Sequence, residues 1–368
     1  MTTPADLAKR VDSGDLLRQA VTSTTVGGIE QLLAQLPIVS EHDTTFDSTN
    51  PSKAWKAGHL HWLPVGRDRG NAGRIKLANQ PVNPMAERIV NGMEALIELM
   101  RAHDLLDNPS APTPPSPRAA IKQYFGLPSL DEIPKIEDPA AAKKTRDIAR
   151  DLARKLRVRL LIDKKKGKWP FTVVIEDEGI GQPPDLVHAT LLSLGTTTKG
   201  DKPYMIGLFG QGGSSAYAIS QYSWVISRRA PRLLNGHADG VGWSVVKQIF
   251  PQGRRDPYFA YLAASPDGQV LTFTSETADS VGIKHGTRFA HIGLDFQKGG
   301  SAIVRNLYPA LNHVLYNPML PYELYAARDD ADVMWGNAYR LSNLSSPSSR
   351  TAAPVLDKTF APQSVGAL

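Results

Sequence analysis

Apolar residues recur at helical spacing in three stretches of the chain, at positions 16–36, 85–100 and 148–156. The first stretch predicts two short helices. The second predicts a long helix, because Pro84 stands near its start and the apolar residues then fall on one face. These residues are Met85, Ile89, Met93, Leu96 and Met100. The third stretch carries Arg and Lys on its other face, so we expect an amphipathic helix with one exposed side.

Short β-like runs dominate the second half of the chain. RVRLLID at 157–163 and WPFTVVIED at 169–177 flank the lysine-rich turn DKKKGK and predict a β-hairpin. Five further runs follow between residues 221 and 295, and AGHLHWLPVG at 57–66 predicts an earlier strand. This order predicts an α+β fold, a two-layer α/β sandwich with a mixed, mostly antiparallel sheet and helices on one face.

Shifts in composition divide the chain into three segments. Residues 1–80 are predicted to be an N-terminal extension, 81–300 the main domain, and 301–368 a C-terminal helix and tail, with the start of a further domain left open. An insertion at about 104–147 contains DNPSAPTPPSPRAAIKQ, which is rich in Pro and Ser. Because such a composition favours loops, we expect this stretch to be exposed and to add nothing to the core.

The composition is that of a globular protein, with 41% hydrophobic and 21% charged residues. No apolar run approaches the roughly 20 residues of a membrane helix, and MTTPADLAKRVDSGD lacks the apolar segment of a signal peptide, so we expect a cytoplasmic protein with no membrane contact. The absence of cysteine excludes disulfides, thiolate zinc sites and cysteine nucleophiles. His59 and His61 form an H-x-H pair without an evident third ligand, so no histidine metal site is expected.

Positive charge is concentrated in one segment. The net charge is +6, but residues 143–168 carry twelve Lys or Arg against three Asp. Such a strip attracts phosphates, nucleic acid or an acidic partner protein. A solvated helix face followed by a charged turn explains the same composition without any ligand.

Four motifs follow one another in the chain: ERIVNGMEAL (87–96), DEGIG (177–181), IGLFGQGGSSAY (206–217) and HGTRF (285–289). Glu87 and Asn91 share a helix face at i and i+4. A carboxylate there can orient water against a terminal phosphate, and an amide oxygen suits Mg²⁺. Asp177 can accept a hydrogen bond from an adenine amine, while backbone amides of the glycine-rich stretch can bind phosphates at a helix that begins near Ser214.

Each motif also has a purely structural explanation. A polar helix stripe, an Asp-x-Gly turn, close packing of helix on sheet and an ordinary strand threonine are all common. The four motifs in this order, however, resemble the GHKL ATPases, which include gyrase, the ninety-kilodalton heat-shock chaperones, histidine kinases and MutL. The resemblance covers roughly residues 81–300 and is strongest to the chaperone branch, whose pattern I-G-x-F-G-x-G-x-x-S-A-Y is matched at every specified position.

The resemblance implies a Bergerat-type ATP-binding fold and assigns roles to individual residues. Glu87 activates water, Asn91 holds Mg²⁺, Asp177 selects adenine and Thr287 supports Asp177 through water. Lys199 belongs to a lid at 193–205, although an ordinary exposed lysine fits equally, and Glu94 stands where the branch has Asp. The implied nucleotide-binding residues are Asn91, Glu94, Asp177, Gly179, Gly181, Lys199, Gly207, Phe209, Gly210, Gln211, Gly212, Gly213, Ser214 and Thr287.

The function implied by the resemblance is Mg²⁺-dependent binding and slow hydrolysis of ATP, with lid closure and pairing of two chains into a homodimer. The client stays open between a protein, as in chaperone-like or signalling modules, and DNA bound by 143–168, as in MORC-like or MutL-like machines. An ATP-sensing domain without turnover, or a component of a bacterial defence module, is a further alternative. The chain departs from the family in its long insertion, in having little room after residue 300 for the middle domain that supplies a phosphate-sensing lysine, and in lacking a phosphoacceptor-histidine helix.

Overall fold

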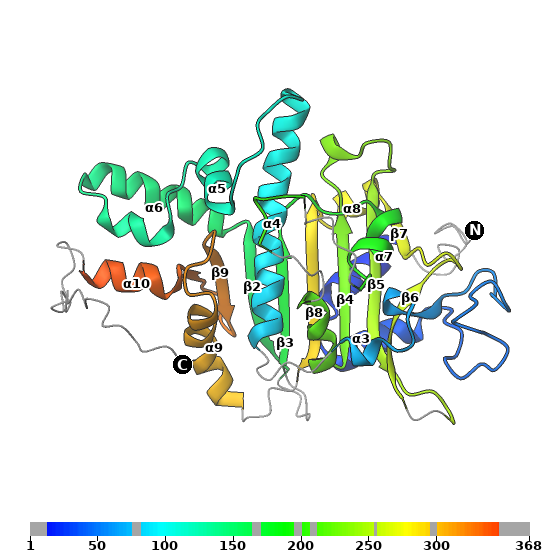
Figure 1. Cartoon of the computed structure of the whole chain (residues 1–368). Coiled ribbons are helices and arrows are strands. Elements are labelled where there is room, and N and C mark those ends of the chain that lie inside the picture. Colours follow the sequence, from blue (N-terminus) through cyan, green and yellow to red (C-terminus); the bar gives the residue numbers. More distant parts are fainter. Residues whose placement is uncertain are drawn as a thin grey trace, which may run out of the picture.

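A ten-stranded sheet forms the centre of the molecule (Figure 1). The computed structural model describes residues 13–75, 82–163, 171–194, 201–206, 212–253, 256–294 and 300–345. Within them the strand order is β1-β6-β5-β4-β8-β3-β2-β9-β10, with β7 paired to β5. The strands are β1 His61–Pro64, β2 Leu156–Ile162, β3 Phe171–Asp177, β4 Tyr222–Arg228, β5 Gly240–Ile249, β6 Tyr258–Ala263, β7 Leu271–Thr274, β8 Gly286–Leu294, β9 Tyr322–Ala326 and β10 Asp332–Met334.

Helices precede, separate and follow these strands along the chain. The α-helices are α2 Ser13–Thr22, α3 Val26–Ala34, α4 Val82–Asp107, α5 Pro117–Phe125, α6 Pro139–Ala153, α7 Val187–Thr190, α8 Ser275–Ser280, α9 Gly300–Val314 and α10 Gly336–Ser345. The 3₁₀ helices are η1 Val65–Arg67, η2 Asn71–Gly73, η3 Leu130–Lys135, η4 Pro184–Leu186, η5 Gly212–Ile219 and η6 Pro231–Leu233. Among the described residues, no helix combines the length and the apolar character that crossing a bilayer demands.

The pairing of the strands confirms the predicted α+β sandwich. Neighbouring strands of the described sheet run antiparallel except β2 and β9, which are parallel. The predicted hairpin is β2 with β3, and its register sets Leu156 opposite Asp177. The mostly antiparallel sheet therefore follows the expectation from the strand pattern.

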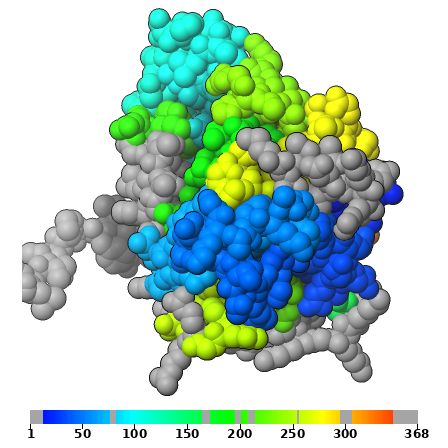
Figure 2. Space-filling view, turned by 90° about the vertical axis from the view of Figure 1, so that its right-hand side faces the viewer, coloured from blue at the N-terminus to red at the C-terminus, as the bar shows by residue number. Residues whose placement is uncertain are grey.

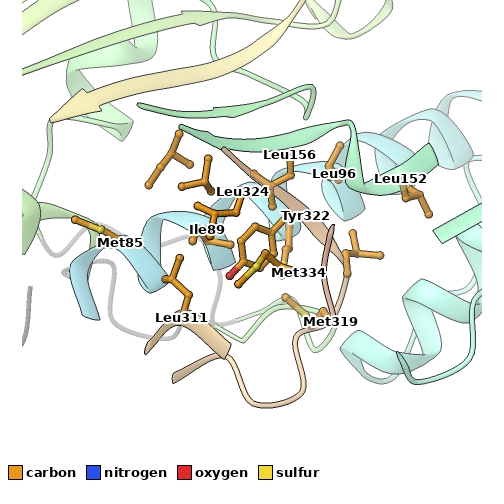
Figure 3. Packing of buried hydrophobic residues seen from close by; sticks show 14 of the residues in the cluster. Met85, Ile89, Leu96, Leu152, Leu156, Leu311, Met319, Tyr322, Leu324 and Met334 are labelled. Carbon is orange, nitrogen blue, oxygen red and sulfur yellow. The ribbon is translucent and has the colours of Figure 1, made fainter. Parts of the chain in front are cut away.

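Helix α4 crosses one face of the sheet and packs on β2 and β3. Val173 and Ile175 of β3 point to this face, because side chains alternate along a strand. The cluster also takes in α5, α9 and β9. Figure 3 shows apolar side chains from several of these elements meeting in it, among them Met85, Ile89, Leu156, Tyr322 and Leu324. Four of the five residues whose helical spacing predicted α4 lie in this cluster, namely Met85, Ile89, Met93 and Leu96, whereas Met100 is half-buried outside it.

The opposite face of the sheet carries helices as well. Val174 of β3 and Trp224 of β4 point to that side and pack with Leu17 of α2 and Leu32 of α3. The expectation of helices on one face thus holds for α4, α5 and α9, while the N-terminal helices and α8 cover part of the other face. Viewed from the side, residues 13–75 form much of the surface (Figure 2).

The prediction that the Pro-rich stretch adds nothing to the core is wrong. Ser116 caps α5 through its side chain, which accepts a hydrogen bond from the Ala119 amide, and Pro117 occupies the first helical turn. Ala120 and Ile121 of α5 are then buried in the α4 cluster, as are residues at 127–133 that follow it. Proline and serine acted here as a helix start rather than as a loop.

Strands from all three predicted segments lie in the one sheet. β1 comes from residues 1–80 and pairs with β6, while β9 comes from residues 301–368 and pairs with β2. Leu307 and Leu311 of α9 are buried in the same cluster as α4. The segment 81–300 therefore shares its sheet and its core with residues on both sides of it.

Candidate functional site

Helix α4 lies directly over the end of β3, where the first two motifs meet. A Cβ atom added to Gly179 would lie 2.5 Å from the Cβ of Ala95, and one added to Gly92 would lie 3.4 Å from the Cβ of Asp177. The Ile180 amide donates to the Ala95 carbonyl at 3.0 Å. The small residues of DEGIG and of α4 thus bring the two motifs, which are far apart in the sequence, into van der Waals contact.

Asp177 is the most strongly perturbed carboxyl group of the site. It is 8% exposed, and its Oδ1 accepts a hydrogen bond of 2.9 Å from the Gly179 amide. Burial raises the pKa of Asp177 to about 7, against the opposing effect of hydrogen bonds from the backbone amides of Gly179 and Thr287. A buried carboxyl that titrates near neutrality marks a candidate ligand site.

Thr287 lies beside Asp177 in the sheet. The two residues are opposite each other in the β3–β8 register. The Thr287 hydroxyl contacts the hydroxyl of Ser227 at 2.9 Å, and Ser227 also donates to the Gly286 carbonyl. Ser227 was missed by sequence reasoning, because a serine in a strand gives no signal until its neighbour across the sheet is known.

The turn after Asp177 is held by long-range contacts. Gly181 adopts a φ of +62°, and a Cβ there would lie 1.8 Å from the Arg228 carbonyl oxygen, so only glycine fits. The Nδ1 of His285 lies 2.8 Å from the Gly179 carbonyl oxygen. A cavity of about 250 Å³ adjoins this turn, with Asp177, Ser227 and Thr287 in its wall. The second and fourth motifs therefore form one cluster where β3 ends and β8 begins.

The polar residues of α4 fall into two groups. Glu87 is exposed and Asn91 half-buried, one helical turn apart. Partial desolvation raises the pKa of Glu87, and the charge of Arg88 opposes the shift. Glu94 is instead 1% exposed, and its Oε1 accepts a hydrogen bond of 2.7 Å from the Ile206 amide. Glu94 thus holds the backbone at the start of the glycine-rich stretch.

Residues 201–206 are fastened to α4 just before that stretch. Lys202 forms an ion pair with Glu98 of α4, and Tyr204 and Met205 are buried. The predicted site residues Lys199, Gly207, Phe209, Gly210 and Gln211 lie outside the described residues. Gly212, Gly213 and Ser214 open η5, which packs against α4 and begins two residues earlier than the helix predicted near Ser214.

The basic segment is divided between α6 and β2. Lys143 pairs with Asp147 and Arg154 with Asp151, each at 2.7 Å on the exposed face of α6. Arg159 of β2 lies over the ring of Tyr325, 4.1 Å from its centroid. The lysine-rich turn of the basic segment, 164–168, lies outside the described residues.

The histidine pair at 59 and 61 is part of the scaffold. His61 is fully buried, its ring centroid lies 3.9 Å from that of Trp55, and burial lowers the pKa of His61 to about 4. In the described part of the chain, no group of three His, Asp or Glu side chains is arranged to hold a metal ion by itself.

No protein-family model matches the chain, and no curated protein matches it. The geometry of α4, the DEGIG turn and β8 is therefore the basis for a functional proposal.

Proposed function

We propose that the chain is a Mg²⁺-dependent ATPase of the GHKL type. The observation that carries the proposal is the convergence of three sequence motifs on Asp177: α4 packs on it at Gly92, the DEGIG turn folds back on its carboxylate, and Thr287 stands beside it. Helices, turns and strands far apart in the chain meet where a nucleotide of this family would bind.

In this proposal Asp177 accepts a hydrogen bond from the exocyclic amine of adenine. Its burial excludes water and so makes the discrimination between donor and acceptor groups on the base strong. Gly179, close to Ala95, leaves the turn flat beneath the base. The hydroxyl groups of Thr287 and Ser227 contact each other and would line the site next to the Asp177 carboxylate.

The polar face of α4 supplies the chemistry. Glu87 is open to solvent and has a raised pKa, which suits a general base that orients water against the terminal phosphate. The amide oxygen of Asn91 is a suitable donor for Mg²⁺, whose remaining ligands would be phosphate and water oxygens. When bound, Mg²⁺ offsets the negative charge that the phosphates carry in the transition state.

Phosphate release from this site would be slow, and the conformation of the chain would depend on the bound nucleotide. Glu94 and Glu98 connect α4 to residues 201–206, which comprise the end of the predicted lid and the first residue of the glycine-rich stretch. Nucleotide contacts made there would reach the lid through this segment, and closure would promote pairing of two chains in the cytoplasm. Sedimentation with and without a non-hydrolysable ATP analogue tests the pairing.

Calorimetry with MgATP on the parent and on Asp177→Asn tests the site, followed by phosphate release from the same samples. We expect binding by the parent and its loss in the variant. Glu87→Gln is expected to bind MgATP within about threefold of the parent but to release phosphate about a hundredfold more slowly. A parent that binds no MgATP contradicts the proposal. Unchanged phosphate release by Glu87→Gln would leave a nucleotide-binding domain in which Glu87 is not the base.

A further inference from the structure

Arg88 is a buried cation without an ion-pair partner in the described part of the chain. Its side chain lies in the interior, with the residue 8% exposed, and its Nε and Nη2 atoms have no hydrogen-bond partner. Among the described residues, no carboxylate forms an ion pair with it. The charge of Arg88 acts on its neighbour Glu87, but the two form no ion pair, because consecutive residues of a helix do not face each other. An unpaired buried charge costs several kcal/mol, so its retention calls for an explanation.

The surroundings of Arg88 contain further polar atoms without partners. The guanidinium lies over the ring of Phe289 in β8, with Cζ 3.7 Å from the ring centroid, and 5.4 Å from that of Tyr217 in η5. The Tyr217 hydroxyl and the Nε2 of His291 also lack partners. Burial, aided by Arg88, lowers the pKa of His291 well below its usual value. Arg88 is thus the positive charge of a layer enclosed by α4, η5 and β8.

A second arginine of α4 shows what a structural cation looks like in this helix. Arg101 is 7% exposed and almost as deeply buried as Arg88. Its guanidinium donates to the carbonyls of Ala111 and Pro112, to Asp104 and to the Thr113 hydroxyl, at 3.0 to 3.3 Å. The described residues thus provide hydrogen-bond partners for both terminal nitrogens of Arg101, but none for the Nε and Nη2 atoms of Arg88.

The position of Arg88 along α4 indicates which anion is missing. Ala95 lies against Gly179, and Gly92, one turn earlier, lies against Asp177. One turn earlier again, Arg88 lies on Phe289, which follows Thr287 by two residues and faces the same side of β8. A nucleotide with its base at Asp177 and its terminal phosphate near Glu87 must therefore extend past Arg88.

We propose that Arg88 binds the phosphate chain of the nucleotide. Its guanidinium, which belongs to α4, supplies a positive charge next to the terminal phosphate. This inference rests on the proposed ATPase function. In the absence of nucleotide the guanidinium is held on the Phe289 ring. Binding replaces that contact with charge-assisted hydrogen bonds to phosphate oxygens, for which the planar guanidinium is well suited.

The test uses the full chain with Arg88→Met, Arg88→Lys and the matched control Arg101→Met. Calorimetry with MgATP and MgADP is expected to show that Arg88→Met weakens MgATP binding about ten- to a hundredfold and MgADP binding less. Arg88→Lys is expected to recover part of the loss. Thermal unfolding without nucleotide should leave Arg88→Met at or above the parent midpoint, while Arg101→Met falls below it.

Four outcomes overturn the inference. If Arg88→Met binds MgATP within twofold of a parent that binds it, Arg88 does not contact the phosphates, although the ATPase proposal stands. If the midpoint of Arg88→Met falls and both nucleotides weaken equally, Arg88 is a structural residue. If millimolar inorganic phosphate raises the unfolding midpoint of the parent as much as MgATP does, Arg88 binds free phosphate ions and not the phosphate chain of a nucleotide. A parent that binds neither nucleotide overturns the ATPase function and this inference together.

Discussion

At the scale of single residues, buried polar groups distinguish the candidate site from the remainder of the core. Asp177 has its pKa raised to about 7 by burial, and Arg88 lacks a counter-ion among the described residues. Both groups reduce the stability of the ligand-free protein, and both face the space between α4 and the sheet. A fold that keeps such groups trades stability for ligand binding.

Asp177→Asn is expected to stabilise the ligand-free protein in a pH-dependent manner. The folded-state pKa lies above the unfolded value of 3.8, so the carboxyl group reduces stability progressively as pH rises from about 4 to about 7, and fully above that. The advantage of the variant should therefore be small at pH 4.5 and reach up to about 4 kcal/mol at pH 8. Chemical denaturation across this range measures it.

Asp267→Asn is the control for that series, because Asp267 is exposed in a turn and its substitution removes the same charge. If the difference in unfolding free energy between Asp177→Asn and the parent is independent of pH, the Asp177 carboxyl does not titrate near neutrality.

At the scale of elements, the site depends on how closely α4 approaches the end of β3. Glycines at 92 and 179 and alanine at 95 allow the approach, and the amide of Ile180 fixes it through the Ala95 carbonyl. Because both Asp177 and the polar face of α4 are positioned by this contact, a change of less than 1 Å in the packing would separate the groups that are proposed to bind the two ends of the nucleotide.

Gly179→Ala is expected to cost about 1 to 3 kcal/mol of stability and to abolish nucleotide binding. The added methyl would meet the Cβ of Ala95 at 2.5 Å and its backbone carbonyl carbon at 2.7 Å, so α4 must move away from β3. Gly27→Ala is the matched control, since nothing lies within 4 Å of its Cβ position in α3, and it should fold normally. Chemical denaturation measures the stability of both variants, and calorimetry measures their binding of MgATP. Binding of MgATP by Gly179→Ala as strong as that of the parent would contradict the expected effect.

At the scale of the whole molecule, the proposed nucleotide site is part of a larger sheet than the resemblance covers. β9 pairs in parallel with β2, the strand beneath α4, and α9 packs on the cluster that α4 also enters. On the other edge, β1 pairs with β6, and α2 and α3 cover the face opposite α4. The elements around the site are therefore held by residues from both ends of the described chain.

A chain ending at residue 300 is expected not to fold. It lacks the buried side chains of Leu311, Leu320, Tyr322 and Leu324, which are at most 1% exposed, and it leaves β2 with an unpaired edge. Near-ultraviolet circular dichroism and analytical size exclusion should show loss of tertiary structure and aggregation. A truncated chain that is monomeric and unfolds cooperatively would show that residues up to 300 fold without β9, α9 and β10.

The sequence by itself determined the local elements and the candidate chemistry. Periodic apolar residues located α4 and its buried face, alternating runs located β3, β4, β5 and β8, and the motifs named Asp177, Glu87 and Thr287. These features depend on neighbours within a few residues, and such contacts are encoded directly in the spacing of side chains.

The tertiary structure alone decided which of these residues meet. Ser227 beside Thr287, Glu94 on the Ile206 amide, the open guanidinium of Arg88 and the burial of α5 all arise between segments far apart in the chain. Strand order and helix packing set such contacts, and no local pattern records them. The burial that raises the pKa of Asp177 is likewise a property of the packed molecule, because it exists only once α4 covers the end of β3.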